Sequence, residues 1–116
     1  MPERRQHARV SAAVPVAVER DGQVSVLRAA NLSAGGVWIA LDRGELPSVE
    51  PGAQVRVRID LGSDQFGRPL DVDCEAEVVR VDLGGPDRPP GFALMWTSED
   101  AGVARQLAVI LEYLHG

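Results

Sequence analysis

Apolar and polar side chains alternate along most of the first hundred residues, which is the pattern of β-strands with one buried face. The alternation predicts six strands, at residues 14–20, 23–30, 37–41, 53–61, 72–81 and 92–96. Asp21-Gly22 separates the first two strands, and this dipeptide is typical of a two-residue hairpin turn. Glycine or proline marks each later break, so we expect successive strands to be joined by turns and loops.

The alternation slips by one residue in the fifth predicted strand. Apolar residues occupy every second position from Val72 to Val78, but the apolar phase then moves to Val79 and Val81. One extra residue in a strand changes the phase in this way and bends the strand. The slip therefore predicts a β-bulge or strong bend near Val78.

The period changes to that of an amphipathic helix near the C-terminus. The apolar residues form one stripe at helical spacing, namely Val103, Leu107, Ile110, Leu111 and Leu114. Thr97 or Ser98 is expected to cap the helix, because Glu99 and Asp100 then suit the positive end of its dipole. The helix is placed at residues 98–115.

Six short antiparallel strands and one helix predict an all-β fold class, a six-stranded antiparallel β-barrel with a C-terminal amphipathic α-helix. Closing the sheet removes its exposed edges, and the helix covers an opening or a flank, or offers part of its apolar stripe to a partner. We expect one domain over residues 1–116, with a flexible arginine arm at 1–10, the barrel at 11–97 and the helix at 98–115.

The net charge and the cysteine content indicate which binding partners and which cellular compartment to expect. The net charge of −5 disfavours a broad basic surface for nucleic acid. The one cysteine, Cys74, cannot form an intramolecular disulfide, which fits a cytoplasmic location. No apolar run approaches the roughly 18 to 20 residues of a membrane helix, so membrane insertion is not expected.

The sequence offers no constellation typical of catalysis. His7 and His115 lie near the two ends without matching partner motifs, and Ser33 is not in a Gly-x-Ser-x-Gly elbow. Paired carboxylates such as Glu75 and Glu77 share the polar face of a strand, where solvation is the ordinary state. The chain is therefore not expected to be an enzyme, and no metal site is predicted.

The first candidate binding element is the basic arm formed by Arg4, Arg5 and Arg9. A guanidinium group pairs bidentately with phosphate and with the O6/N7 edge of guanine, and it also stacks on bases. Such an arm on an acidic body suits a small anion better than a duplex. The alternative is a solvated basic tail.

The second element is the segment between the second and third strands, which reads Asn31-Leu32-Ser33-Ala34-Gly35-Gly36. Asn and Ser side chains can bond a base edge, and glycine permits a close approach of the backbone to a ligand. The alternative is a tight turn in which Asn31 and Ser33 satisfy local backbone groups.

Taken together, the two elements resemble the signature of the PilZ domain family. The signature is Arg-x-x-x-Arg before the first strand and Asn-x-Ser-x-x-Gly between the second and third, and here it falls on Arg5, Arg9, Asn31, Ser33 and Gly36. The likeness runs roughly from 4 to 114 and extends to Pro51-Gly52, Val78-Val79-Arg80 and Gly91-Phe92.

The resemblance implies the predicted barrel and binding of the bacterial second messenger cyclic di-GMP on its outside. It implies that Arg5 and Arg9 contact guanine and phosphate, and that Asn31 and Ser33 bond guanine edges or phosphate. Gly36 would let the backbone turn beneath the ligand. In this family the residue before the first motif arginine, here Arg4, is thought to influence ligand number, and an intercalated ligand dimer is expected.

The sequence and the resemblance suggest three functions, and the favoured one is a receptor for cyclic di-GMP. Ligand is expected to order the N-terminal arm and so to alter contact with an unidentified effector protein, with motility or biofilm control implied by the family alone. An adaptor of the same fold that binds no nucleotide is the alternative. A small barrel for single-stranded nucleic acid comes third, because the chain is acidic and has few aromatic residues, so DNA and RNA are not expected partners. Whether the chain forms a homodimer stays open.

The remaining residues have structural interpretations. Trp38 and Trp96 are expected in the core or partly covered, and Cys74 is expected to be a small buried hydrophobe. Arg80 could approach the ligand, but an exposed strand arginine is the favoured interpretation.

Overall fold

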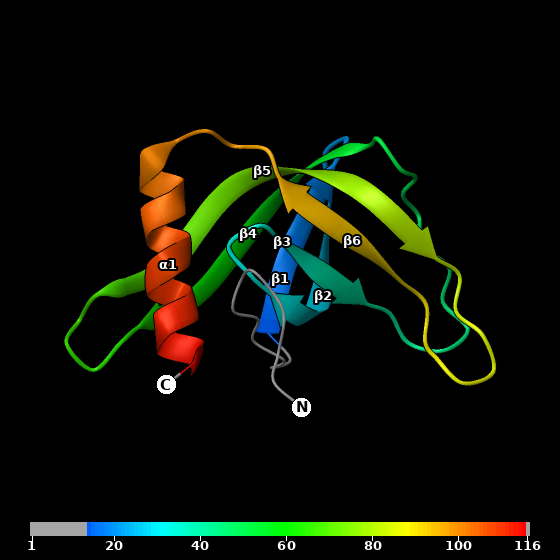
Figure 1. Ribbon diagram of the computed structural model, residues 1–116, viewed down its shortest axis with the longest axis horizontal. Helices are drawn as coiled ribbons and strands as arrows, with labels where there is room; N and C mark the ends of the chain where they lie inside the picture. Colours follow the sequence, from blue (N-terminus) through cyan, green and yellow to red (C-terminus); the bar gives the residue numbers. More distant parts are fainter. Residues whose placement is uncertain (1–13, 116) are drawn as a thin grey trace, which may run out of the picture.

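Six strands close into one barrel in the order β1-β2-β3-β6-β5-β4, and every neighbouring pair is antiparallel (Figure 1). The computed structural model describes residues 14–115. Its elements are β1 Val14–Arg20, β2 Gln23–Leu32, β3 Gly36–Ala40, β4 Gln54–Ser63, β5 Pro69–Asp82, β6 Gly91–Trp96 and α1 Ala101–His115. The predicted barrel with a C-terminal helix is confirmed, whereas the predicted arm at 1–10 lies outside the described residues.

The β1–β2 hairpin turns on Asp21 and Gly22, as predicted. Both residues are in the left-handed region, with φ of 53° and 81°. Two successive positive φ values define the mirror-image turn whose twist matches that of the flanking strands. The turn therefore fixes the register in which Arg20 pairs with Gln23 and Val14 pairs with Ala29.

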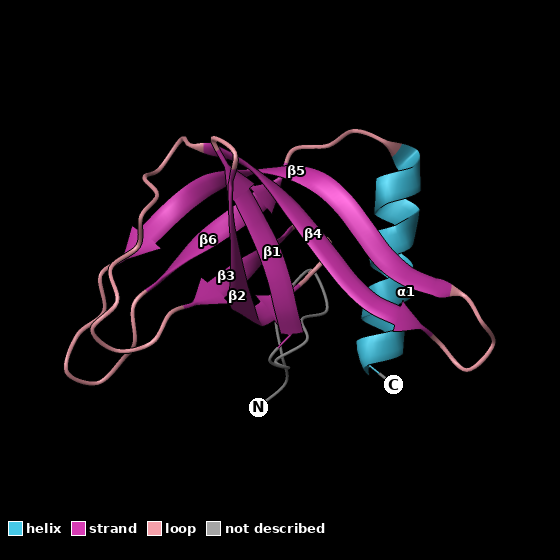
Figure 2. Ribbon diagram, turned by 180° about the vertical axis from the view of Figure 1, so that it is seen from behind, coloured by secondary structure: helices cyan, strands magenta, loops and turns pink. Residues whose placement is uncertain are grey.

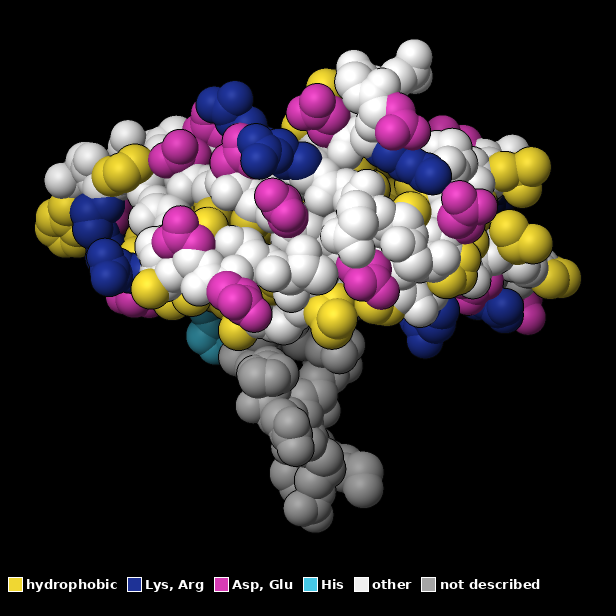
Figure 3. All heavy atoms as spheres, turned by 90° about the horizontal axis from the view of Figure 1, so that it is seen from above, with side chains coloured by type: hydrophobic (Ala, Val, Ile, Leu, Met, Phe, Trp, Pro, Cys, Tyr) yellow, Lys and Arg dark blue, Asp and Glu magenta, His cyan; other side chains and the backbone are white. Residues whose placement is uncertain are grey.

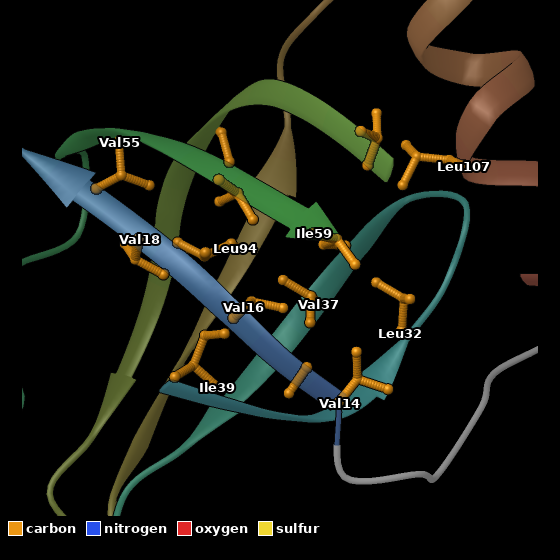
Figure 4. Close-up of a cluster of buried hydrophobic side chains, with 14 of the residues drawn as sticks. Val14, Val16, Val18, Leu32, Val37, Ile39, Val55, Ile59, Leu94 and Leu107 are labelled. Carbon is orange, nitrogen blue, oxygen red and sulfur yellow. The ribbon is translucent and has the colours of Figure 1, made fainter. Parts of the chain in front are cut away.

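The core is filled by the inward-facing side chains of the strands and closed by the helix. Val57, Ile59 and Val78 have no exposed surface. Figure 4 shows Leu107 of α1 pointing toward the end of the barrel where Leu32 and Ile59 lie. The predicted cover for the barrel is thus provided by the apolar stripe of α1, which runs along β5 at one flank (Figure 2). Among the described residues, no helix combines the length and apolar character that crossing a bilayer requires.

The helix begins at Ala101, and its cap is Asp100, so the prediction of Thr97 or Ser98 as the cap is wrong. The Gly102 N–H donates to Asp100 Oδ1 over 2.7 Å, and the Ala104 N–H donates to the Asp100 carbonyl over 3.2 Å. A carboxylate at this position satisfies a free N–H and also interacts with the positive end of the helix dipole.

Replacing Asp100 by Ala is expected to lower the free energy of unfolding by about 1 kcal/mol, the usual effect of losing an N-cap. Urea denaturation followed by circular dichroism measures the change. Ser98→Ala is the matched control and is expected to change stability by less than about 0.5 kcal/mol. A larger loss in the Ser98 variant than in the Asp100 variant would assign the cap to Ser98.

Register shifts interrupt three ladders of the described sheet, β2–β3, β4–β5 and β5–β6, and the first and the last of them lie beside β3 and β6. The β5–β6 register shifts between Val78 and Arg80, which confirms the predicted bulge. The β2–β3 register shifts between Ala29 and Asn31, a position that the sequence pattern did not predict. An extra residue in one strand changes the face to which the following side chains point.

Candidate ligand-binding site

A row of four residues crosses the outer face of the barrel and defines the candidate site. Asn31 of β2 pairs with Trp38 of β3, Trp38 pairs with Ala93 of β6, and Ala93 pairs with Arg80 of β5. The neighbouring strands β3, β6 and β5 run side by side in Figure 1. We call these four residues the cross-strand row.

The bulge in β5 turns Arg80 outward. Val78 pairs with the buried Leu94, and the next pair joins Arg80 to Ala93, so that Val79 is the extra residue. Because side chains alternate between the two faces of a strand, a regular ladder would pair Val79 with Ala93 and would point Arg80 into the barrel. The phase slip visible in the sequence therefore places a guanidinium on the outer surface.

The bulge in β2 has the same effect on Asn31. Ala29 pairs with the buried Ile39, and the next pair joins Asn31 to Trp38, which leaves Ala30 as the extra residue. In a regular ladder Ala30 would pair with Trp38, and the Asn31 side chain would face the core. Both polar ends of the cross-strand row thus depend on a bulge, a device that is common beside functional sites.

Trp38 and Arg80 pack against each other across the small residue between them. The Arg80 Cζ atom lies 5.2 Å from the centroid of the Trp38 ring, within the range of a cation–π interaction. Ala93 stands between them and leaves room for this contact. Trp38 is half-buried, as predicted, but its ring also borders the site, a role that was not expected for it.

The cross-strand row lines a surface hollow of about 730 Å³. Ser33, Gly35 and Met95 also border the hollow. Its volume falls within the range of small-molecule sites, and its walls combine an aromatic ring, an amide and a guanidinium. The arrangement suits a ligand that is flat, polar at its edges and negatively charged.

Ser33 shapes the turn between β2 and β3 with its hydroxyl group. The Gly35 and Gly36 N–H groups donate to Ser33 Oγ over 3.2 Å and 3.3 Å. The hydroxyl also lies 3.3 Å from the Gly36 carbonyl, to which the Ser33 N–H donates over 2.9 Å. This is the local role that we considered as the alternative for Ser33, and its direct contact with a ligand stays a prediction.

Gly36 is constrained by the neighbouring strand. It pairs with Met95, and a Cβ atom at Gly36 would overlap the carbonyl oxygen of Leu94. We expected glycine here so that the backbone could turn beneath a ligand. In the structure, the backbone that approaches Gly36 closely is that of β6.

The predicted residues Arg4, Arg5 and Arg9 lie outside the described residues. The described chain begins at Val14, which pairs with Ala29, two residues before Asn31. The described chain therefore begins beside the Asn31 end of the cross-strand row.

In the part of the chain that the structure describes, we also looked for a metal site and for a reactive cysteine. Within residues 14–115, no group of three His, Cys, Asp or Glu side chains is arranged to hold a metal ion. Burial raises the pKa of the Cys74 thiol to about 11, with a smaller contribution from Asp73, so the thiol is protonated at neutral pH. Cys74 is 3% exposed, which confirms it as a small buried hydrophobe.

The surface charge beyond the site is mixed. On the outer face of the barrel, Arg56 Nε lies 3.6 Å from Asp73 Oδ1, and Arg56 Nη2 lies 3.9 Å from Glu75 Oε1. Figure 3 shows acidic and basic side chains interspersed on the upper face of the molecule. That face does not have the continuous basic character that duplex binding requires.

Comparison with known proteins gives a consistent family and fold. The family model described as the PilZ domain matches residues 3–113. The inhibitor of motility MotI/DgrA from Bacillus subtilis has a TM-score of 0.72 and 25% identity, over 98% of this chain and 51% of that one. The PilZ domain of YcgR from Escherichia coli, determined with c-di-GMP, has a TM-score of 0.70 and 19% identity, over 97% and 92% of the two chains.

A third structure, the complex of MrkH from K. pneumonia with c-di-GMP, has a TM-score of 0.69 and 14% identity, over 98% of this chain and 53% of that one. The chain therefore spans about half the length of MotI/DgrA and of MrkH. No curated protein matches the sequence. At 19% and 14% identity, the likeness to YcgR and MrkH shows the fold alone.

Proposed function

Because the chain belongs to the PilZ domain family, we propose that it is a receptor that binds cyclic di-GMP in the hollow beside the cross-strand row. The carrying observation is that two bulges bring Asn31, Trp38 and Arg80 together on the outer face. Cyclic di-GMP has two guanines and two phosphates. It therefore needs a surface for stacking, partners for purine edges and cations, and the row supplies one of each.

The proposed receptor uses its N-terminal arginines to complete the site. Arg9 precedes Val14 by five residues and Arg5 precedes it by nine, so their backbones can lie up to about 17 Å and 31 Å from Val14. Either distance is long enough for the chain to fold back and bring an arginine side chain over the hollow that borders Asn31. Arg4 then adds a third guanidinium, which suits a second, intercalated ligand molecule.

The similar proteins support this proposal and suggest which cellular processes ligand binding could control. YcgR and MrkH were determined with c-di-GMP, MrkH is described as a c-di-GMP-dependent transcription regulatory factor, and MotI/DgrA is an inhibitor of motility. We propose that this chain acts through an effector protein, with motility or biofilm control as the output. Since MrkH is described as a transcription factor, the expectation that this chain binds no nucleic acid stays a prediction.

Isothermal titration of the native chain with cyclic di-GMP tests the proposal. Saturable heat with roughly micromolar or tighter affinity is expected, because two or three arginine–guanine contacts outweigh the cost of ordering an arm. The stoichiometry decides between one ligand and an intercalated pair. GMP is the matched comparison and is expected to bind far more weakly, since it cannot span the arm and the row. Absence of heat with cyclic di-GMP would favour the adaptor that binds no nucleotide.

Replacing Arg80 by Ala is expected to weaken binding about 5- to 30-fold, because a charge-assisted contact contributes about 1–2 kcal/mol and the Trp38 ring loses its partner. Arg58→Ala is the matched control, since Arg58 is also an exposed strand arginine but lies on β4, away from the hollow. The same titration measures both variants. Equal affinities for the Arg80 variant and the native chain would remove Arg80 from the site.

A further inference from the structure

Trp96, the last residue of β6, holds the turn between β2 and β3 by two hydrogen bonds. Its indole Nε1–H donates to the Ser33 carbonyl over 3.1 Å, and its backbone N–H donates to the Gly35 carbonyl over 3.1 Å. One residue therefore fixes two of the carbonyl groups in the Ser33–Gly36 turn. Trp96 does not itself border the hollow.

Trp96 is a firm support because it is fixed from other directions. Its backbone pairs with Ala76 of β5, and the next residue, Thr97, donates its N–H to the Glu75 carbonyl over 3.0 Å. Its ring is half-buried and packs against the core. A hydrogen-bond donor held in this way has little freedom to move with the turn.

The turn depends on this support because its own polar groups are already engaged with one another. The Ser33 hydroxyl and N–H both bond within the turn. The Ser33 carbonyl instead points to the indole of Trp96. The indole bond therefore ties the Ser33 end of the turn to β6, next to the backbone bond that ties Gly35 to the same residue.

We propose that Trp96 is a positioning residue for the ligand-binding turn, acting through its indole N–H on the Ser33 carbonyl. This inference rests on the proposed function. A site binds well when the groups around the ligand are held in place before it arrives by a second layer of packed, hydrogen-bonded residues. Trp96 provides that layer for Ser33, since it bonds the turn but does not border the hollow.

Trp96→Phe tests the inference, because it keeps an aromatic ring against the core and removes the indole donor, although the phenyl ring is smaller than the indole. The backbone bond from residue 96 to Gly35 is retained. Loss of one hydrogen bond of this kind is expected to weaken cyclic di-GMP binding about 3- to 10-fold. Tyr113→Phe, an exposed change on α1, is the matched control and is expected to leave the dissociation constant unchanged. Thermal unfolding of each variant then tests whether its folded fraction at the titration temperature equals that of the native chain.

The indole resonances of the native chain give a second measurement, for which the variants serve only to assign the signals. The native chain has two tryptophans, so ¹⁵N labelling gives two indole signals, and Trp96→Phe or Trp38→Phe identifies them. We expect the Trp96 indole proton to exchange with water more slowly than that of Trp38, and to slow further when cyclic di-GMP is added. The slowing at the Trp96 indole should exceed the slowing of core amides, which any ligand that stabilises the fold produces, because the turn itself becomes more rigid around a bound ligand.

The outcomes separate the inference from the proposed function. If the native chain gives no heat with cyclic di-GMP, the proposed function fails and the inference fails with it. If the native chain binds, but the folded Trp96 variant binds equally well and the Trp96 indole does not respond, the inference alone is overturned. Weaker binding by the variant together with a responding indole supports it.

Discussion

Replacing Arg5 and Arg9 together by Ala is expected to weaken cyclic di-GMP binding by about 30-fold to 10⁴-fold, the largest effect on binding that we predict. Each bidentate pair between an arginine and a guanine contributes about 1–3 kcal/mol, so two pairs correspond to roughly 2–6 kcal/mol. Stability should not change, because both arginines precede Val14, where the first strand begins. Isothermal titration and thermal unfolding measure the two quantities.

The matched control is Arg56→Ala together with Arg58→Ala, which removes the same charge from the outer face of β4. A small, salt-dependent change is expected there, because the charges act only at long range. Equal losses in the two double variants would mean that net charge, and not the arm, controls affinity. Hydrogen exchange is an independent check: the amides of residues 5–10 should exchange more slowly when the ligand is present, and unchanged exchange would contradict a role for the arm.

Most of the fold could be predicted because its determinants are local. Asp21 and Gly22 specify their turn by residue type alone, and the phase slip after Val78 revealed a bulge within a single strand. The second bulge was missed because its extra residue is Ala30, which follows Ala29. Two alanines in succession produce no clear change between apolar and polar positions.

The helix cap was missed for a related reason. Several polar residues that favour caps precede α1, and the pattern does not distinguish them. The choice of Asp100 depends on where the chain leaves β6. The backbone after Trp96 is still bound to β5 through the Thr97 N–H, so the first helical turn cannot begin until the chain has left the sheet.

The candidate site was predicted only in part, because strand order decides what surrounds the motif. Asn31, Ser33 and Gly36 were chosen from one short segment, and the structure places them at the hollow. Trp38 and Arg80 become neighbours only because β6 inserts between β3 and β5 and carries the small Ala93 at the crossing point. The bulge near Val78 was visible in the sequence. The expectation of an exposed Arg80 is confirmed, but the sequence did not indicate which ring the arginine meets.

The motif and the structure explain the glycine at position 36 differently. By the motif, glycine lets the backbone pass beneath a ligand. By the structure, a Cβ atom at this position would meet the carbonyl oxygen of Leu94, a backbone atom that cannot rotate away. Gly36→Ala is therefore expected to lower the free energy of unfolding by about 2–3 kcal/mol, because β3 and β6 must separate to admit the methyl group.

Gly85→Ala is the matched control for this experiment. Its Cβ would lie 3.7 Å from the end of the flexible Arg88 side chain, an ordinary contact. Urea denaturation should show less than about 0.5 kcal/mol of change there. Titration with cyclic di-GMP then separates the two reasons for Gly36. If the Gly36 variant is as stable as the native chain but does not bind, the glycine faces the ligand. If it is destabilised, the glycine is needed for the contact between β3 and β6 on which the Trp38–Arg80 pair depends.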